Sequence, residues 1–364
     1  MATTQAANIR PEEVSAEWLT WALRRSGVLG EDAAVTSANR EPCGTGQLAD
    51  SYRFTLEYDP PGAGPGTVVG KFASGDEASR TFGQQSGYYR TEILFYQQLA
   101  PRLSAVALPT PLHAEVTDDG AEFVLLMDDL APARAVDQLV GCTIDEAALV
   151  VQQLAALHAG SWRDDRLATM DWLQGAIASF SDITGNFPAT VEAFPATFGE
   201  LVAESDLRQA AKLNALRAKW NQLIRTPLCL WHSDVRADNL LFDARGGRTP
   251  VALLDWQGVG YGYGPIDVAY FLSTSLNIED RRSAERDLVR LYQNELAAQG
   301  IDDYPAERAW DDYRVLAIHP LQIGVFGAGA VRRSERGDQL WKQWIERAAQ
   351  HTRDLDSFQA LAAR

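Results

Sequence analysis

The stretch from Leu230 to Phe271 reads LWHSDVRADNLLFDARGGRTPVALLDWQGVGYGYGPIDVAYF. It contains His232, then Asp234, then Asn239 five residues later, and finally Asp255 after two apolar runs that flank a Gly-Gly pair. The two runs and the turn signal between them predict a β-hairpin. The whole pattern, H-x-D-x4-N, hairpin, D, has the spacing of a kinase catalytic loop followed by a metal-binding aspartate.

The chemistry of phosphoryl transfer accounts for these residue types. The transferred group carries charge on its oxygens, so the protein must position the reactants and neutralise that charge. We expect Asp234 to orient the acceptor hydroxyl and to accept its proton. Asn239 and Asp255, which the hairpin is expected to bring side by side, offer the hard oxygen ligands that Mg²⁺ prefers. The alternative is that the aspartates are ordinary solvated loop residues.

Length and charge limit the classes of protein to consider. A chain of 364 residues is long enough for two lobes with separate cores, and we expect an N-terminal lobe over 1–130 and a C-terminal lobe over 131–364. The net charge of -16 argues against a nucleic-acid partner, because such a surface needs a basic patch. An acidic surface would suit a cationic substrate but more often only aids solubility.

The cysteines and the hydropathy pattern indicate the compartment. Cys43, Cys142 and Cys229 are odd in number and form no CxxC pair, so neither a disulfide framework nor a zinc site is predicted. The first residues show no signal peptide, and the most apolar stretch, Leu321 to Val331, is too short to span a bilayer. We therefore expect a cytoplasmic protein without a membrane partner. The sequence leaves the oligomeric state open.

A glycine-rich turn lies near the N-terminus. After a predicted helix from Ser15 to Gly27, Gly44 and Gly46 open a turn that leads into a strand of alternating apolar residues, Tyr52 to Tyr58. A strand, glycine turn and strand can fold over a triphosphate with backbone N–H groups directed at its oxygens. Candidate nucleotide-binding residues here are Gly44, Gly46 and Ser51. A dinucleotide fold would need a helix directly after the glycines, whereas an ordinary hairpin would look the same.

One lysine lies inside an apolar strand. The chain has only four lysines, and Lys71 is in TVVGKFA, where an unpartnered ammonium group would be costly. Glu92 is its expected partner, because it lies on the inner face of a predicted helix from Tyr88 to Ala100. An ion pair between them would hold Lys71 against the α- and β-phosphates. The alternative is an edge-strand lysine and an exposed glutamate.

A further apolar strand, Glu122 to Leu130, ends in acidic residues and Ala131-Pro132. In a two-lobed kinase this would be the last strand of the small lobe and the hinge, whose backbone groups pair with adenine. Asp128 and Leu130 are therefore candidate cofactor-binding residues through the hinge. The Asp128 and Asp129 side chains are expected to be surface charges without a chemical role.

The rest of the chain predicts mainly helices. Thr143 and Glu146 form a capping box before an apolar helical face, which includes His158 as a hydrogen-bonded core residue. The aromatic segment from Trp162 to Phe198 either packs a helical subdomain or lines an acceptor pocket. Two more amphipathic helices are predicted over 280–299 and 338–363. We therefore expect an α+β, protein-kinase-like, two-lobed fold with an antiparallel sheet in the smaller lobe.

These motifs, in this order, resemble those of the aminoglycoside phosphotransferase and choline kinase superfamily, over roughly Gly44 to Phe271. Within it, LLMDDL, AVDQLVGC, LAALHAGSW and LLDWQGVGYGYGPIDVAYFL are most similar to the ecdysteroid-kinase-like branch, also called CHK kinase-like, in its bacterial form. The resemblance implies a kinase that uses ATP and Mg²⁺ and acts on a hydroxyl of a small molecule. The acceptor would be an aminoglycoside, another amino-sugar, a steroid-like alcohol or an amino alcohol.

The resemblance also implies roles for individual residues. They are the catalytic base Asp234, the metal ligands Asn239 and Asp255, the phosphate-anchoring pair Lys71 and Glu92, and a structural Asp267 that steadies the catalytic loop.

The chain departs from the family pattern in two ways. Ser233 replaces the glycine of the usual HGD, and DWQ replaces the DFG of protein kinases. Protein substrates are not expected, because only eleven residues separate Asp255 from Asp267 and leave little room for an activation loop. A second hypothesis is a pseudokinase scaffold that binds a nucleotide without turning it over.

Overall fold

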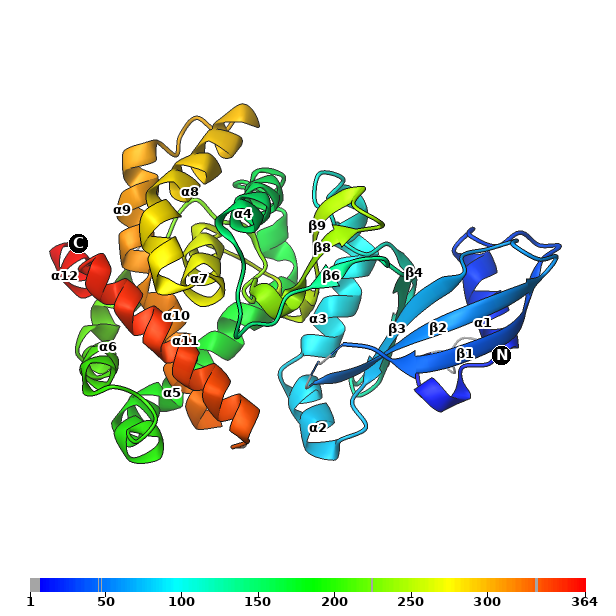
Figure 1. Cartoon of the computed structure of the whole chain (residues 1–364), viewed down its shortest axis with the longest axis horizontal. Coiled ribbons are helices and arrows are strands. Elements are labelled where there is room, and N and C mark those ends of the chain that lie inside the picture. Colours follow the sequence, from blue (N-terminus) through cyan, green and yellow to red (C-terminus); the bar gives the residue numbers. More distant parts are fainter. Residues whose placement is uncertain (1–6, 45, 47, 224, 331–332) are drawn as a thin grey trace. The chain divides into compact units, whose positions relative to one another are not determined.

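The computed structural model in Figure 1 describes residues 7–44, 46, 48–223, 225–330 and 333–364, apart from the side chains of 175–186 and 330. The chain divides into two compact units. The N-terminal unit comprises Met1–Ser104, Leu108–Pro132 and Leu254–Gly258, and the C-terminal unit comprises Ala105–Ala107, Ala133–Leu253 and Val259–Arg364. Asp255 therefore belongs to the N-terminal unit, although it lies late in the sequence.

A five-stranded antiparallel sheet forms the body of the N-terminal unit, with the strand order β1-β2-β3-β5-β4. The strands are β1 (Ala34–Pro42), β2 (Ala49–Asp59), β3 (Thr67–Ala73), β4 (Pro111–Val116) and β5 (Phe123–Asp128). The expected strands around Tyr52, Lys71 and Leu125 are confirmed. In the register of the sheet, Lys71 is opposite Ser51 on β2 and Leu125 on β5.

Three α-helices belong to the described part of this unit. They are α1 (Ala16–Arg25), α2 (Glu77–Gln85) and α3 (Tyr88–Leu94), with a 3-10 turn at Pro11–Glu13. Helices α1 and α3 pack against the sheet. Ser15 caps α1 as expected, and Leu19 and Leu23 of α1 join Phe54, Val68 and other sheet residues in one buried core. The helix expected from Tyr88 to Ala100 is α-helical only as far as Leu94. It continues as a π-helical segment, Phe95–Leu99, and a 3-10 turn, Ala100–Arg102.

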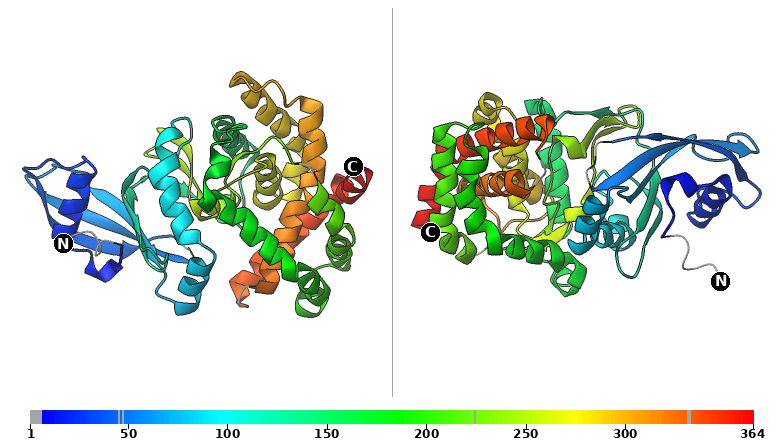
Figure 2. Two further views of the ribbon diagram at one scale, coloured as in Figure 1. Left: turned by 180° about the vertical axis from the view of Figure 1, so that it is seen from behind. Right: turned by 90° about the horizontal axis from the view of Figure 1, so that it is seen from below.

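The C-terminal unit is mainly helical, which confirms the expectation (Figures 1 and 2, green to red). Its helices are α4 (Ile144–Ala159), α5 (Asp171–Phe198), α6 (Glu204–Gln222), α7 (Pro265–Ser275), α8 (Ile278–Ala298), α9 (Ala306–Leu316), α10 (Ile318–Ala330), α11 (Glu335–Asp354) and α12 (Ser357–Ala363). The predicted capping box of α4 is present, since Thr143 and Glu146 bond each other's backbone N–H groups.

Two small antiparallel sheets accompany these helices. One has the order β6-β8-β9 and the other pairs β10 with β7. Their strands are β6 (Arg134–Ala135), β7 (Cys229–Trp231), β8 (Leu240–Ala244), β9 (Thr249–Leu253) and β10 (Gly260–Gly262). Strands β8 and β9 are the hairpin predicted after Asn239, and 3-10 turns at Ala237–Asn239 and Trp256–Gly258 precede and follow it. A further 3-10 turn spans Leu167–Thr169.

Helix α7 lies at the centre of the C-terminal unit. All of its residues from Pro265 to Ser275 are buried, and its neighbours include α4, α8, α9, α10 and α11. Pro265 suits the first turn of the helix, where a backbone N–H has no intrahelical partner. A helix that is covered on every side is held rigidly, so polar groups on it are fixed in position. No helix among the described residues is long and apolar enough to cross a membrane.

Candidate active site

Lys71 is held by two carboxylates within the N-terminal unit. Its Nζ lies 2.9 Å from Oε1 and 2.7 Å from Oε2 of Glu92 on α3, so the expected ion pair is present. The same Nζ lies 2.9 Å from Oδ1 of Asp255. The Lys71 and Glu92 side chains are only 13% and 2% exposed, so neither is a surface charge. The group of Lys71, Glu92 and Asp255 is called the lysine triad below.

Opposing effects set the ionisation of the lysine triad. Burial lowers the pKa of Lys71, but the charges of Asp255 and Glu92 outweigh burial and raise it above its ordinary value. Burial raises the pKa of Glu92, and the charge of Lys71 acts in the opposite direction. Lys71 therefore stays protonated, and the triad contains one positive charge facing two carboxylates.

The residue after Asp255 packs against the π-helical segment that follows α3. Trp256 is fully buried, and its ring stacks on that of Phe95 with centroids 4.2 Å apart and planes 10° apart. Trp256 is the residue that replaces the phenylalanine of DFG. Asp255 itself has φ 63°, a left-handed conformation that aspartate tolerates better than most residues. The packed tryptophan holds Asp255 beside Lys71.

The glycine-rich turn joins β1 to β2. Gly44 has φ 79°, a backbone conformation that favours glycine, and the Cys43 N–H donates to the Ser51 carbonyl at the base of the turn. Gly46 has little free space, since an added Cβ would lie 3.1 Å from the Ala49 carbonyl oxygen. The two strands expected on either side of the glycines are therefore present. Nucleotide binding by Gly44, Gly46 and Ser51 stays a prediction.

The hinge candidates have structural partners. The Asp128 N–H donates to the Thr110 carbonyl, and its Oδ1 accepts the Thr110 N–H at 2.6 Å. Leu130 is buried.

The Asp129 side chain is not the surface charge that was expected, because it is 6% exposed and pairs with Arg53 at 2.6 Å. Burial would raise the pKa of Asp129, but hydrogen bonds from Arg53 and the Ala131 N–H lower it below its ordinary value. Adenine binding by Asp128 and Leu130 stays a prediction.

In the C-terminal unit, Asp234 and Asn239 contact each other directly. The Asn239 Nδ2 donates to the Asp234 carbonyl oxygen at 2.8 Å and to its Oδ2 at 2.9 Å, which leaves the Asn239 Oδ1 oxygen as the group able to bind a cation. Asp234 also accepts from the Tyr270 hydroxyl at 2.7 Å and lies 3.3 Å from the Arg236 Nε. Neither Tyr270 nor Arg236 was among the residues selected from the sequence.

Helix α7 supports the loop that contains Asp234 at several points. Asp267 is fully buried, and its carboxylate accepts the backbone N–H groups of His232 at 2.6 Å and Ser233 at 3.0 Å. Ser275, at the end of the helix, accepts the Ala237 N–H at 3.0 Å. The backbone of the loop is thus tied to a rigid helix on both sides of Asp234. This is the contact that the resemblance implied for Asp267.

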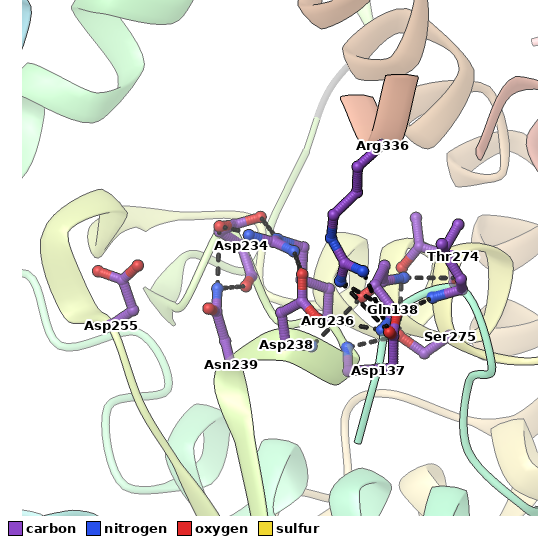
Figure 3. Close-up of polar contacts among 12 residues, drawn as sticks. Asp137, Gln138, Asp234, Arg236, Asp238, Asn239, Asp255, Thr274, Ser275 and Arg336 are labelled. Atoms are coloured by element: carbon purple, nitrogen blue, oxygen red, sulfur yellow. Dashed lines mark hydrogen bonds and ion pairs between the residues drawn. The ribbon is translucent and has the colours of Figure 1, made fainter. Parts of the chain in front are cut away.

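A second support comes from the segment before α4, as Figure 3 shows. The Gln138 N–H donates to Asp238 Oδ1 at 3.0 Å, and its Nε2 donates to the Thr274 carbonyl on α7 at 2.8 Å. Asp238 in turn pairs with Arg236 at 2.6 Å. Burial would lower the pKa of Arg236, but Asp234 and other negative neighbours raise it further above its ordinary value. Arg236 is therefore a fixed cation beside Asp234.

The loop accommodates the serine that replaces glycine. Ser233 has φ 70°, a left-handed conformation that glycine adopts without cost and that other residues adopt at about 1–2 kcal/mol. The contacts from Asp267 hold the loop in this conformation. Ser233 therefore leaves the turn in place and adds local strain.

The expected core role of His158 is confirmed. His158 is fully buried, with Nδ1 2.7 Å from the Tyr292 hydroxyl and Nε2 3.3 Å from Asp267. Phe187, Phe194 and Phe198 of α5 are also buried, which supports packing over a pocket for these three. Phe180, which was considered with them, lies outside the described side chains.

The structure thus brings together two sets of the residues selected from the sequence. Lys71, Glu92 and Asp255 lie together in the N-terminal unit, and Asp234 and Asn239 lie together in the C-terminal unit. That the two sets act on one nucleotide stays a prediction. Tyr270 had a usable signal in the sequence, because it follows Asp267 by one helical turn and so lies on the same side of the helix.

The comparison with family models decides the family. The model of the Ecdysteroid kinase-like family matches residues 48–301, which include every candidate from Ser51 to Asp255. The chain belongs to the Ecdysteroid kinase-like family. This family lies within the superfamily of aminoglycoside phosphotransferases and choline kinases, so membership in a small-molecule kinase family is established. No match was found among curated protein sequences.

Solved structures of the superfamily share the fold of this Ecdysteroid kinase-like chain. An ethanolamine kinase of Plasmodium vivax matches with a TM-score of 0.54 and 10% identity, covering 96% of this chain and 90% of that one. A microcompartment-associated aminopropanol kinase matches at 0.52 and 14%, covering 93% and 98%. A choline kinase from Cryptosporidium parvum matches at 0.50 and 8%, covering 88% and 89%. These matches confirm the kinase-like α+β fold.

Proposed function

We propose that this protein transfers the γ-phosphate of ATP, with Mg²⁺, to a hydroxyl group of a small molecule. The observation that carries this proposal is the lysine triad. A lysine inside a β-strand is held by a helical glutamate and by the aspartate that follows the hairpin. In kinases, a lysine, a glutamate and an aspartate in these places anchor the phosphates and the metal ion. Asp234 and Asn239 supply the other half of the motif from a loop tied to a buried helix.

Each residue has a role that follows from its chemistry. Lys71 supplies positive charge to the phosphate oxygens, and Glu92 keeps it in position. Asp234 accepts a hydrogen bond from the acceptor hydroxyl, orients its oxygen toward the phosphorus and takes up its proton. Arg236, held 3.3 Å from Asp234, adds positive charge next to the reacting group.

The residues present fit a magnesium ion that is bound jointly with phosphates. Among the described residues, no cluster of three or more histidines, cysteines and acids could hold a metal alone. Asn239 Oδ1 and the Asp255 carboxylate are two hard oxygen donors, and Mg²⁺ commonly takes one or two protein ligands and completes its shell with phosphates and water. When bound, the ion would neutralise charge on the phosphates. We propose Asn239 and Asp255 as its ligands.

The charged groups beside Asp234 already have partners within the protein. The nearby carboxylates of Asp238 and Asp267 already bind Arg236 and backbone N–H groups. His319 is stacked on Trp220 and lies near Tyr270, and burial lowers the pKa of His319 to about 3, so it is neutral at pH 7. Any binding site for a cationic acceptor would therefore have to use carboxylates other than Asp238 and Asp267. The four acceptor classes are distinguished by the screen below.

An ATP-consumption screen tests the proposed function. Purified protein with Mg²⁺ and ATP is assayed against aminoglycosides, amino-sugars, sterol-like alcohols and amino alcohols, with Asp234→Asn as the control. We expect turnover with at least one acceptor and a loss of about 100-fold or more in the variant. Equal turnover by both proteins would contradict the assignment of Asp234. Nucleotide binding without turnover on any acceptor would favour the pseudokinase scaffold.

A further inference from the structure

A buried tyrosine on α7 reaches the proposed catalytic base. The Tyr270 hydroxyl lies 2.7 Å from Asp234 Oδ1, while Tyr270 as a residue is 2% exposed. Burial first, and the negative charge of Asp234 second, raise the pKa of Tyr270 well above its ordinary value. The hydroxyl therefore keeps its proton, and it donates that proton to the carboxylate oxygen in this bond.

Tyr270 is in a fixed position relative to the backbone of the catalytic loop. It lies on the same buried helix as Asp267, one turn later, and Asp267 binds the N–H groups of His232 and Ser233 directly before Asp234. The Tyr270 ring also packs edge-on against Trp344, with centroids 5.4 Å apart. One rigid helix thus forms hydrogen bonds both to the backbone before Asp234 and to the carboxylate of Asp234 itself.

Asp234 needs such a contact because its other neighbours do not fix Oδ1. Asn239 donates to Oδ2 at 2.9 Å. The Arg236 Nε lies almost equally far from both oxygens, 3.3 Å from Oδ1 and 3.4 Å from Oδ2, so it attracts the carboxylate without selecting one orientation. Together, Tyr270 and Asn239 each bind one oxygen and define the plane of the carboxylate.

We propose that Tyr270 is a positioning residue that holds the Asp234 carboxylate in the plane from which it contacts the acceptor hydroxyl. This inference rests on the proposed function of Asp234. It predicts that losing the hydroxyl of Tyr270 affects the chemical step and not the affinity for nucleotide or acceptor, because Tyr270 reaches the substrates only through Asp234.

The first test is the steady-state kinetics of Tyr270→Phe with MgATP and an acceptor found by the screen. We expect kcat to fall by about 10-fold or more, with KM for both substrates within about twofold. Tyr304→Phe is the matched control, since Tyr304 is also buried and its hydroxyl also donates to an aspartate, Asp312, at 3.2 Å. The control should retain wild-type kinetics. A Tyr270→Phe enzyme with unchanged kcat would overturn the proposal.

Two unnatural residues at position 270 separate positioning from folding. 4-Fluorophenylalanine fills the volume of the hydroxyl but donates no hydrogen bond, so it should reproduce the loss of kcat even if the smaller phenylalanine weakens folding. 4-Aminophenylalanine keeps a donor at the same place and should restore kcat to within about threefold. Full activity with the fluorinated residue would contradict the proposed role.

A double-mutant cycle gives a readout that a general structural defect would not produce. In an Asp234→Ala background, Tyr270→Phe should reduce the residual rate by less than about twofold, since there is no carboxylate left to position. An equal loss in both backgrounds would show that Tyr270 acts on folding and not on Asp234.

Crystal structures of wild type and Tyr270→Phe distinguish failure of this inference from failure of the proposed function. If the wild type phosphorylates no acceptor, the proposed function fails, yet a rotated Asp234 carboxylate in the variant would still support positioning. If the wild type is active and the Asp234 carboxylate keeps its orientation in the variant, the positioning role is wrong while the kinase assignment stands.

Discussion

The Nζ of Lys71 lies 2.9 Å from Oδ1 of Asp255, although 184 residues separate them in the sequence. The same ammonium group also binds Glu92, so one cation holds together a strand, a helix and the segment after the β8–β9 hairpin, all within the N-terminal unit. Without this ammonium group, the two carboxylates would have no cation between them.

Removing Lys71 should destabilise the protein. In Lys71→Met, the buried Glu92 would lose its cation, and breaking a buried pair by removing one partner costs about 3–5 kcal/mol. We expect the free energy of unfolding in urea to fall by about 3 kcal/mol. Lys342→Met, which removes an exposed lysine of α11, is the control and should change it by less than about 0.5 kcal/mol. Equal stabilities of the two variants would show that the triad contributes nothing to folding.

Acid should destabilise the protein partly through His113. Its side chain packs edge-on against the rings of Trp18 and Trp21, and burial first, then the charge of Arg25, lower its pKa from 6.5 to about 4. Between these values the unfolded chain binds a proton that the folded protein does not, so stability falls as the pH decreases from 6.5 to 4.

The matching measurement compares wild type with His113→Phe, which keeps an aromatic ring and removes the titrating group. The unfolding free energy of wild type should decrease more steeply over this range, by about 1.4 kcal/mol per pH unit more than in the variant. Parallel pH dependences would mean that His113 is accessible to protons in the folded state.

Position 233 should prefer glycine to a β-branched residue. Its φ of 70° is free of cost for glycine and strained for any other residue, and most of all for a β-branched one. We expect Ser233→Gly to be at least as stable as wild type, and Ser233→Val to be less stable than Ser233→Gly by about 1–2 kcal/mol. Thermal denaturation measures both. A valine variant as stable as the glycine variant would contradict the left-handed conformation.

Asp267→Asn should weaken the loop that contains Asp234. The carboxylate accepts two backbone N–H groups, and an amide would turn its own NH₂ group toward one of them. We expect a loss of about 2–3 kcal/mol in the free energy of unfolding, together with a lower kcat. Asp302→Asn, at an exposed position, is the control. A variant that matches this control in both properties would show that Asp267 does not hold the loop.

Much of the fold could be predicted because local patterns were strong. The capping box at Thr143 and Glu146, the alternation from Tyr52 to Tyr58 and the Gly-Gly turn between β8 and β9 each specify one structure. The end of α3 could not be predicted. Nothing in the sequence from Phe95 to Leu99 signals a π-helical segment, which depends on packing such as that of Phe95 against Trp256.

The pairing of Lys71 with Glu92 could be predicted from the sequence. A lysine within an apolar strand needs a carboxylate, and Glu92 was the nearest one on an inward helical face. The bond from Lys71 to Asp255 was not predictable, because each residue already had another assigned role. Tyr270 was missed for a different reason: it lies in a wholly apolar run, where a tyrosine is read as core until its hydroxyl is seen to reach Asp234.

The most direct test of the kinase assignment is the transfer of ³²P from γ-labelled ATP to the acceptor found in the screen. Wild-type protein with Mg²⁺ should label the acceptor, and Asp234→Asn should lower the rate by about 100-fold or more. Asp243→Asn, which changes an exposed aspartate on the neighbouring strand β8, should label it at the wild-type rate. Labelling by Asp234→Asn as fast as by wild type would contradict the account.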